Sequence, residues 1–203
     1  MSRQRQMNKK EEVKQLILNT AREIMAKEGI NKISIRKITN ELDYSPGIVY
    51  HYFKDKEEII ETLLKEGYGR ILNSIQEIKK SEKEPEKEIR ERFMSYINAV
   101  LKFSDYYLAI TLSNKPSILQ YTGMLHKGVS EDRKSINILC DSIRKGIQLN
   151  QFTECDVELT AQALWVSIFG LTIRLLIEGE IQIEQRERLI NQQLDILMNG
   201  IKK

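Results

Sequence analysis

The sequence predicts an all-α protein. Only 10 Gly and 3 Pro occur among 203 residues, and runs of strict apolar–polar alternation, the pattern of a half-buried strand, are short or absent. Apolar residues instead recur at helical spacing along most of the chain. With 41% hydrophobic and 30% charged residues, the chain can bury a core and keep a solvated surface. These patterns predict about nine helices.

The first helix is expected to begin at Lys9. Residues 1–8 have no apolar face, so we expect a disordered basic arm there. Gly29 provides a stop, because glycine takes a positive φ without strain at a helix C-terminus. The apolar face of this helix consists of Val13, Leu16, Ile17, Ala21 and Ile24.

A two-turn helix ending near Leu42 is predicted next. Ser34 is a suitable N-cap, and Ile33 and Ile38 then occupy the two positions of a hydrophobic staple. The alternation of Ile33 with Ile35 could also indicate a strand, but the cap and the staple favour the helix.

A third short helix and a longer fourth helix follow. Ser45 is the expected N-cap of the third, with Pro46 at its first position, where the missing N–H costs nothing. Asp55 and Glu58 have the spacing of a capping box at the start of the fourth helix, which continues for about six turns.

The rest of the chain is also expected to be helical. Residues 79–88 read as an exposed turn or linker, and we interpret the carboxylates of residues 82–91 as solvated surface charges. Further helices are expected at about 86–103, 106–113, within 117–149, from the N-cap Asp156 to about Ile177, and at about 184–201.

The charge of the chain is unevenly distributed. Residues 1–56 hold 12 Lys and Arg against 7 Asp and Glu, a balance of +5, whereas residues 57–203 hold 20 against 22, a balance of −2. A basic N-terminal segment on a mildly acidic body is compatible with binding of a polyanion.

Two short helices joined by a tight turn, over about residues 33–53, form a helix-turn-helix pattern. Small residues at the start of the second helix let its backbone approach base edges in the major groove. The helix N-terminus and the Ser45 hydroxyl suit phosphates, as do the polar tips of Tyr50 and His51 and the charges of Lys54 and Lys56. For Phe53, packing in the core is the favoured alternative.

This segment resembles the DNA-binding signature of the TetR family of bacterial transcriptional regulators. The resemblance lies in residues 33–59, ISIRKITNELDYSPGIVYHYFKDKEEI, with Asp43 where the family usually has Gly. Asp tolerates the left-handed conformation better than most residues, but its charge would lower the affinity for DNA. The resemblance implies that Ser45, Tyr50 and Lys56 contact phosphates, with Pro46, Gly47 and His51 near base edges. The candidate DNA-binding residues are Ser34, Arg36, Ser45, Pro46, Gly47, Tyr50, His51, Lys54 and Lys56.

The same resemblance implies two domains, a DNA-binding domain at residues 9–56 and a regulatory and dimerisation domain at 57–203. Residues 161–171, AQALWVSIFGL, are similar to the family's penultimate helix, which pairs with the last helix across a homodimer. A small-molecule effector, apolar or weakly polar, is implied for the second domain. For each candidate pocket residue, a place in the core is the favoured alternative; the candidates are Tyr96, Phe103, Tyr107, Asn114, Met124, His126, Trp165 and Phe169.

The sequence therefore predicts a cytoplasmic transcriptional regulator, most simply a repressor that a ligand releases from a palindromic operator. We expect no enzyme activity, no cofactor and no metal, because His51 and His126 lack ligands at suitable spacing. Cys140 and Cys155 are expected to be free thiols. The apolar run near Arg174 is too short for a membrane span. The rival hypothesis is a helical interaction protein whose basic segment binds a protein or a membrane.

Overall fold

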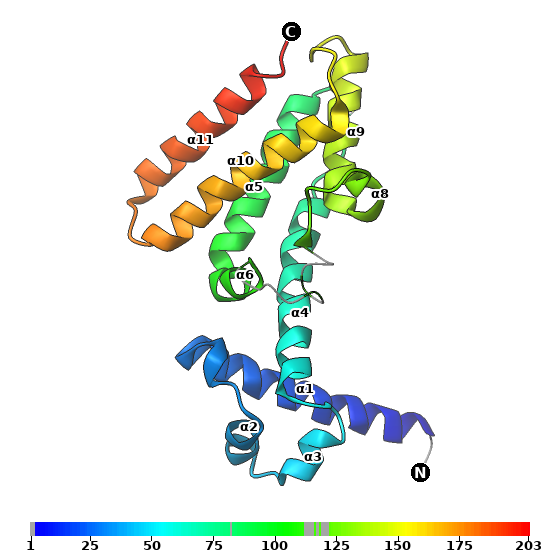
Figure 1. Cartoon of the computed structure of the whole chain (residues 1–203), viewed down its shortest axis with the longest axis vertical. Helices are drawn as coiled ribbons and strands as arrows, with labels where there is room; N and C mark the ends of the chain where they lie inside the picture. Colours follow the sequence, from blue (N-terminus) through cyan, green and yellow to red (C-terminus); the bar gives the residue numbers. More distant parts are fainter. Residues whose placement is uncertain (1–2, 82, 112–115, 117, 119–121) are drawn as a thin grey trace. The chain divides into compact units, whose positions relative to one another are not determined.

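The computed structural model of the chain describes all residues except 1–2, 82, 112–115, 117 and 119–121 (Figure 1). The described residues form ten α-helices and one short 3₁₀-helix, with no strand among them, so the predicted all-α class is confirmed. The chain divides into two compact units, one of residues 1–68 with 105–113 and one of residues 69–104 with 114–203. The first unit thus extends beyond residue 56, the end of the DNA-binding domain expected from the sequence.

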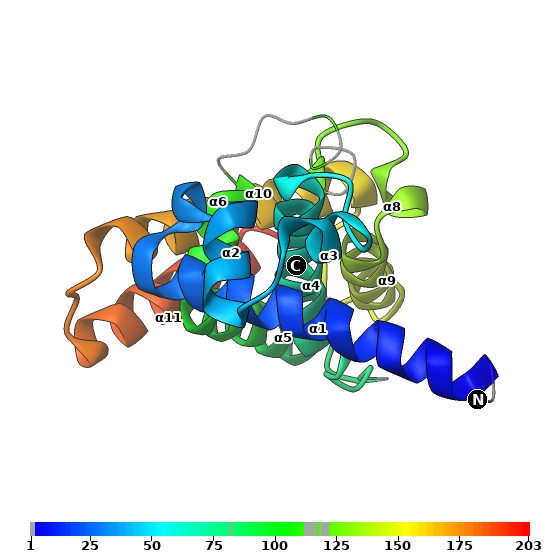
Figure 2. The same ribbon diagram turned by 90° about the horizontal axis from the view of Figure 1, so that it is seen from below.

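The first unit is built around a core to which four helices contribute. Its elements are α1 (Arg3–Glu28), η1 (Ile30–Lys32), α2 (Ile35–Leu42), α3 (Pro46–Tyr50), the first part of α4 (Lys56–Gln76) and most of α6 (Ser104–Thr111). The core cluster consists of Ile17, Leu18, Ala21, Ile24, Met25, Ile33, Ile38, Val49, Phe53, Ile59 and Leu63. Figure 2 shows α1, α2 and α3 from below.

Helix α1 is longer than the sequence indicated. It begins at Arg3, so the predicted disordered arm over residues 1–8 is wrong for the residues that the structure describes. Periodicity could not reveal this turn and a half, because it has no apolar face. Its Arg, Gln and Met side chains nevertheless have good helix propensity, and extending an existing helix avoids the cost of nucleation.

The local end signals of the next helices are largely confirmed. Ser34 Oγ accepts a hydrogen bond from the N–H of Lys37 at 3.2 Å, and Gly29 ends α1 with φ 92°. The Asp55 carboxylate accepts from the N–H of Glu58 at 2.8 Å, and the Glu58 carboxylate accepts from the N–H of Lys54 at 2.6 Å. Ser45 differs, since it occupies the N-cap position of α3 without a capping hydrogen bond from its side chain.

The second unit packs five helices beside the end of α4. They are α5 (Pro85–Lys102), α8 (Val129–Asp132), α9 (Lys134–Gln148), α10 (Val157–Glu178) and α11 (Ile183–Asn199). Helix α10 packs against α5, α9 and α11 (Figure 1). It is the one described helix long and apolar enough to cross a membrane by length and composition, and 39% of its most apolar window is buried in the structure.

Two expectations for this unit need correction. Helix α5 spans Pro85–Lys102, close to the helix expected at about 86–103, so the linker expected over residues 79–88 is shorter than predicted; proline fits the first helical position. The helical region expected over 117–149 is interrupted, since residues 123–128 are not helical and Arg133 is extended between α8 and α9. Gly128, at φ 81°, occupies the left-handed conformation at the start of α8.

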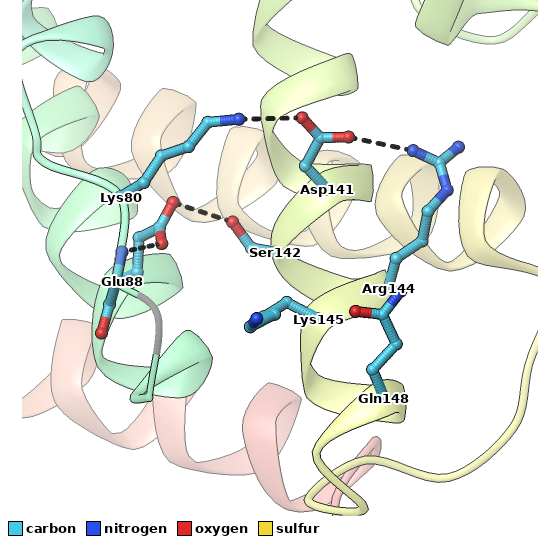
Figure 3. Close-up of a pocket in the computed structure, with 8 residues that line it drawn as sticks. Lys80, Glu88, Asp141, Ser142, Arg144, Lys145 and Gln148 are labelled. Atoms are coloured by element: carbon cyan, nitrogen blue, oxygen red, sulfur yellow. Dashed lines mark hydrogen bonds and ion pairs between the residues drawn. The ribbon is translucent and has the colours of Figure 1, made fainter.

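A buried polar cluster joins several segments of this unit. Glu88, expected at the surface, is only 4% exposed and pairs with Arg92. Its carboxylate also accepts hydrogen bonds from the N–H of Ser81 at 2.6 Å and from Ser142 Oγ at 3.0 Å, beside a cleft of about 300 Å³ (Figure 3). Asp141 lies on the same cleft and pairs with Lys80 and Arg144.

Residues near the C-terminus form backbone hydrogen bonds with the loop between α9 and α10. The N–H of Thr153 donates to the carbonyl of Ile201 at 2.9 Å, and the N–H of Lys203 donates to the carbonyl of Gln151 at 3.1 Å. The Phe152 ring fills the space above Gly146. Cys140 is buried in α9, and burial raises the pKa of its thiol, whereas Cys155 is half-buried in the loop.

Candidate DNA-binding site

The turn between α2 and α3 depends on Asp43. This residue has φ 52° and ψ 42°, in the left-handed region that aspartate tolerates. The N–H groups of Asp43 and Tyr44 both donate to the carbonyl of Thr39, which closes the end of α2. The chain therefore reverses over a few residues, as a helix-turn-helix requires, and α3 begins at Pro46.

Helix α3 is anchored on one side and open on the other. Val49 and Phe53 are buried in the core, and so the core role is confirmed for Phe53. Ser45, Pro46 and Gly47 are exposed at the start of the helix. A Cβ added at Gly47 would meet only the Ser45 hydroxyl oxygen, at 3.9 Å. Packing within the chain therefore does not require this glycine, and its small size leaves room for an external partner.

Two polar aromatic side chains follow on the same helix end. Tyr50 is 56% exposed although its ring is large and apolar. His51 is exposed, and its ring meets the partly buried ring of Tyr52 edge-on, with 5.2 Å between centroids. Tyr52 packs against the core, so it holds His51 at the surface.

The remaining candidates are charged or hydroxyl-bearing residues at helix starts. Arg36 and Lys54 are exposed, and Lys56 Nζ lies 3.8 Å from the carboxylate of its neighbour Glu57. The Ser34 hydroxyl already caps α2, but its proton remains able to donate to a phosphate oxygen.

Ile48 is a further candidate, not among those expected from the sequence. This residue follows Gly47 on α3 and is 37% exposed. The signal was present in the spacing, because Val49 and Phe53, four residues apart, define the buried face and leave Ile48 outside it. An apolar side chain at this point can contact the methyl group of a thymine.

The residues expected to form an effector pocket are only partly brought together. Tyr96 on α5 and Trp165 on α10 are both buried, with ring centroids 4.8 Å apart, and Phe93 lies 6.3 Å from Trp165. Met124 is buried beside α10, where the Gln162 amide donates to its carbonyl at 2.9 Å. The rings of Phe93, Tyr96 and Trp165 form an interior aromatic cluster in the second unit.

The other candidate pocket residues lie elsewhere. The His126 ring is exposed and pairs with Asp132 at 3.1 Å, while its backbone carbonyl accepts a hydrogen bond from the Gln162 amide on α10 at 3.1 Å. Phe103 is half-buried, with the charges of Arg70 and Lys102 about 6 Å from its ring centre. Tyr107 is buried in the first unit, Phe169 is half-buried on α10, and Asn114 lies outside the described residues.

Comparisons with known proteins agree with this geometry. Residues 17–63 match the model of the bacterial regulatory proteins, tetR family. The chain is 30% identical over 190 residues to the fatty acid metabolism regulator protein of Bacillus subtilis (strain 168), covering 91% of this chain and 93% of that relative.

Solved structures share the fold along nearly the whole chain. A Clostridium perfringens protein described as a fatty acid metabolism regulator aligns with a TM-score of 0.65 at 20% identity, covering 93% of this chain and 99% of that one. SmeT, the repressor of the Stenotrophomonas maltophilia multidrug efflux pump SmeDEF, aligns with a TM-score of 0.70 at 16% identity, covering 94% and 90%.

The chain is thus a helix-turn-helix regulator of transcription. It belongs to the TetR family of bacterial transcriptional regulators. A DNA-binding repressor role fits these relatives, which are regulators and not enzymes. Members of the family bind DNA operators, often respond to small-molecule effectors, and typically dimerise.

Proposed function

We propose that the protein is a ligand-responsive repressor that binds a palindromic operator as a homodimer in the cytoplasm. The observation that carries this proposal is the open N-terminus of α3, where Ser45, Pro46 and Gly47 are exposed on a helix anchored by Val49 and Phe53. A rigid, small-residue helix start is what close approach to base edges demands.

Each candidate residue then has a definite role. Pro46, Gly47 and His51 lie near base edges, with Ile48 available for an apolar contact. Ser45, Tyr50 and Lys56 contact phosphates, and Ser34, Arg36 and Lys54 flank them. Phosphate contacts fix the orientation of the helix on the duplex, while the base contacts select the sequence.

The homodimer would form through α10 and α11. Leu159, Val166 and Ile177 are exposed on α10 at i, i+7 and i+18, which is one stripe of the helix, with the exposed small residues Ala163 and Gly170 between them. Leu189 and Ile196 form a similar exposed pair on α11. A twofold pairing of these faces would remove apolar side chains from water and present two copies of α3 to a palindrome.

The effector would be an apolar or weakly polar molecule held near the aromatic cluster of Tyr96 and Trp165. Because the B. subtilis relative is a regulator of fatty acid metabolism, we further propose that the genes controlled here serve fatty acid metabolism. The effector can change DNA affinity only through a difference in its own affinity for the two conformations of the protein.

The decisive experiment is selection of bound sequences from random duplex DNA at near-physiological salt. The proposal predicts an enriched palindrome, whose half-site spacing would follow from the dimer. A helical interaction protein with a basic segment would bind DNA, if at all, without sequence preference, and that outcome would refute a regulator. With the operator in hand, fatty acids of increasing chain length are then tested for release of the DNA.

A further inference from the structure

A second basic surface adjoins α3 in the first unit. A groove of about 340 Å³ runs between the start of α1 and the end of α3, and we call it the α1–α3 groove. It is lined by Met7, Lys10, Glu11, Lys14, His51 and Tyr52. Lys10 and Lys14 are one helical turn apart and share a face of α1, and the continuation of this helix to Arg3 adds Met7 to the same wall.

The two ends of the groove are held in place by the core. Lys14 Nζ lies 5.8 Å from the centre of the Phe53 ring, close enough for a cation–π interaction, while the side chain stays half-exposed. On the opposite wall, Tyr52 supports the ring of His51. Two cationic side chains and an imidazole therefore face one hollow beside the helix that enters DNA.

One carboxylate reduces the positive charge of the groove. Glu11 lines the same groove and accepts a hydrogen bond from the Gln15 amide at 3.0 Å. Its negative charge lowers the attraction of the groove for an anion. Removal of the Glu11 charge should therefore raise the affinity of the groove for an anion, whereas removal of the Lys10 charge should lower it.

We propose that the α1–α3 groove binds a phosphate of the DNA backbone beyond the contacts made by the start of α3. This inference rests on the proposed function, since it takes α3 as the helix that enters the major groove. His51 belongs both to the end of α3 and to the groove, so a duplex seated on α3 passes alongside Lys10 and Lys14. The contact is sequence-independent and adds to affinity through release of counterions.

The test is the salt dependence of DNA binding by the full-length protein. Because both protomers of the dimer lose one phosphate contact, each worth about 0.9 on duplex DNA, we expect Lys10→Gln to make the negative slope of log affinity against log salt shallower by about 1.8. The loss should be the same for the selected operator and for an unrelated duplex of equal length, because no base is read. Glu11→Gln should instead tighten binding at a fixed salt concentration.

Two further variants separate charge from folding. Lys27→Gln removes an exposed lysine at the far end of α1, roughly 20 Å along the helix from Lys14, and should leave the slope unchanged. Lys14→Arg keeps both the charge and the stacking on Phe53 and should bind like the wild type. Thermal unfolding of each variant verifies that the fold is intact.

The outcomes distinguish the groove from the proposed function. Suppose that the wild type selects an operator while Lys10→Gln and Glu11→Gln match it in slope and affinity. The phosphate contact in the groove is then refuted, and the proposed function as a regulator is retained. If the wild type binds no duplex at any salt concentration, both proposals fail. A weaker salt dependence of DNA binding for Lys10→Gln, together with tighter binding by Glu11→Gln, supports a phosphate contact in the α1–α3 groove.

Discussion

Glu88 and Arg92 form a buried ion pair one turn apart on α5, with 2.9 Å between Arg92 Nη2 and Glu88 Oε1 and exposures of 4% and 6% for the two side chains. Arg92 also donates to the carbonyl of Ile75 near the end of α4. Through Ser81 and Ser142, Glu88 reaches the α4–α5 connection and α9. The pair therefore joins four segments of the second unit.

The structure predicts that breaking this pair is more harmful than removing it. Arg92→Met leaves Glu88 buried without its countercharge and should lower the free energy of unfolding by about 3–5 kcal/mol. The double variant Glu88→Met with Arg92→Met should recover part of that loss, since no buried charge remains. Urea unfolding of the three proteins measures both values, and a double variant less stable than the single one would contradict the argument.

Two glycines in the second unit should respond oppositely to the same substitution. A Cβ at Gly146 would lie 2.0 Å from the Phe152 ring, so Gly146→Ala must displace a buried aromatic side chain and should cost about 1–3 kcal/mol. Gly69, inside α4, has no atom within 4 Å of such a Cβ, and Gly69→Ala should be neutral or stabilising by up to about 1 kcal/mol. Equal changes in melting temperature for the two variants would contradict the close packing of Phe152 against Gly146.

The exposed stripe on α10 makes a prediction about assembly. Val166→Asp places a charge in the proposed dimer interface and should yield monomers that have lost most of their operator affinity. Leu125→Asp, at an apolar side chain that is 72% exposed in the loop before α8, is the matched control and should remain dimeric. Sedimentation at micromolar concentration measures the oligomeric state of the three proteins. A wild type that sediments as a monomer would refute the proposed interface.

Stability should depend on pH through Glu158. This carboxylate accepts hydrogen bonds from the Ser130 hydroxyl and from the N–H groups of Ser130 and Gly128. These bonds stabilise the charged form and hold the pKa of Glu158 below its ordinary value, with the largest effect from the hydroxyl. The stabilisation is therefore complete above the unfolded pKa and is lost as pH falls through the lower folded pKa. Glu158→Gln should flatten the stability profile between these two values, and an unchanged acid limb would contradict this role.

Sequence reasoning succeeded where a structure is set by neighbouring residues. Ser34, Asp55 and Asp156 cap their helices as expected, because a cap needs only the residues of its own first turn; the Asp156 carboxylate accepts from the N–H of Leu159 at 3.0 Å. The exposed start of α3 was likewise readable from Ser45 and Pro46.

It failed where contacts between distant segments decide the outcome. The interruption of the expected helix before α8 coincides with hydrogen bonds from the N–H groups of Gly128 and Ser130 to the Glu158 carboxylate, about thirty residues away in the sequence, which the local pattern could not show. Glu88 looked like one surface carboxylate among several, because its partners Ser81 and Ser142 belong to other segments. The α1–α3 groove was missed for the same reason, since its lining comes partly from α1 and partly from His51 and Tyr52 at the end of α3.

The unequal burial of the two cysteines has a practical consequence. Cys140 is enclosed in α9 with a raised thiol pKa, so little nucleophilic thiolate is available there at neutral pH, whereas Cys155 is half-open to solvent. In the native protein a maleimide dye should therefore attach to Cys155 far faster than to Cys140. The unmodified chain can thus be labelled at essentially one position without engineering a thiol.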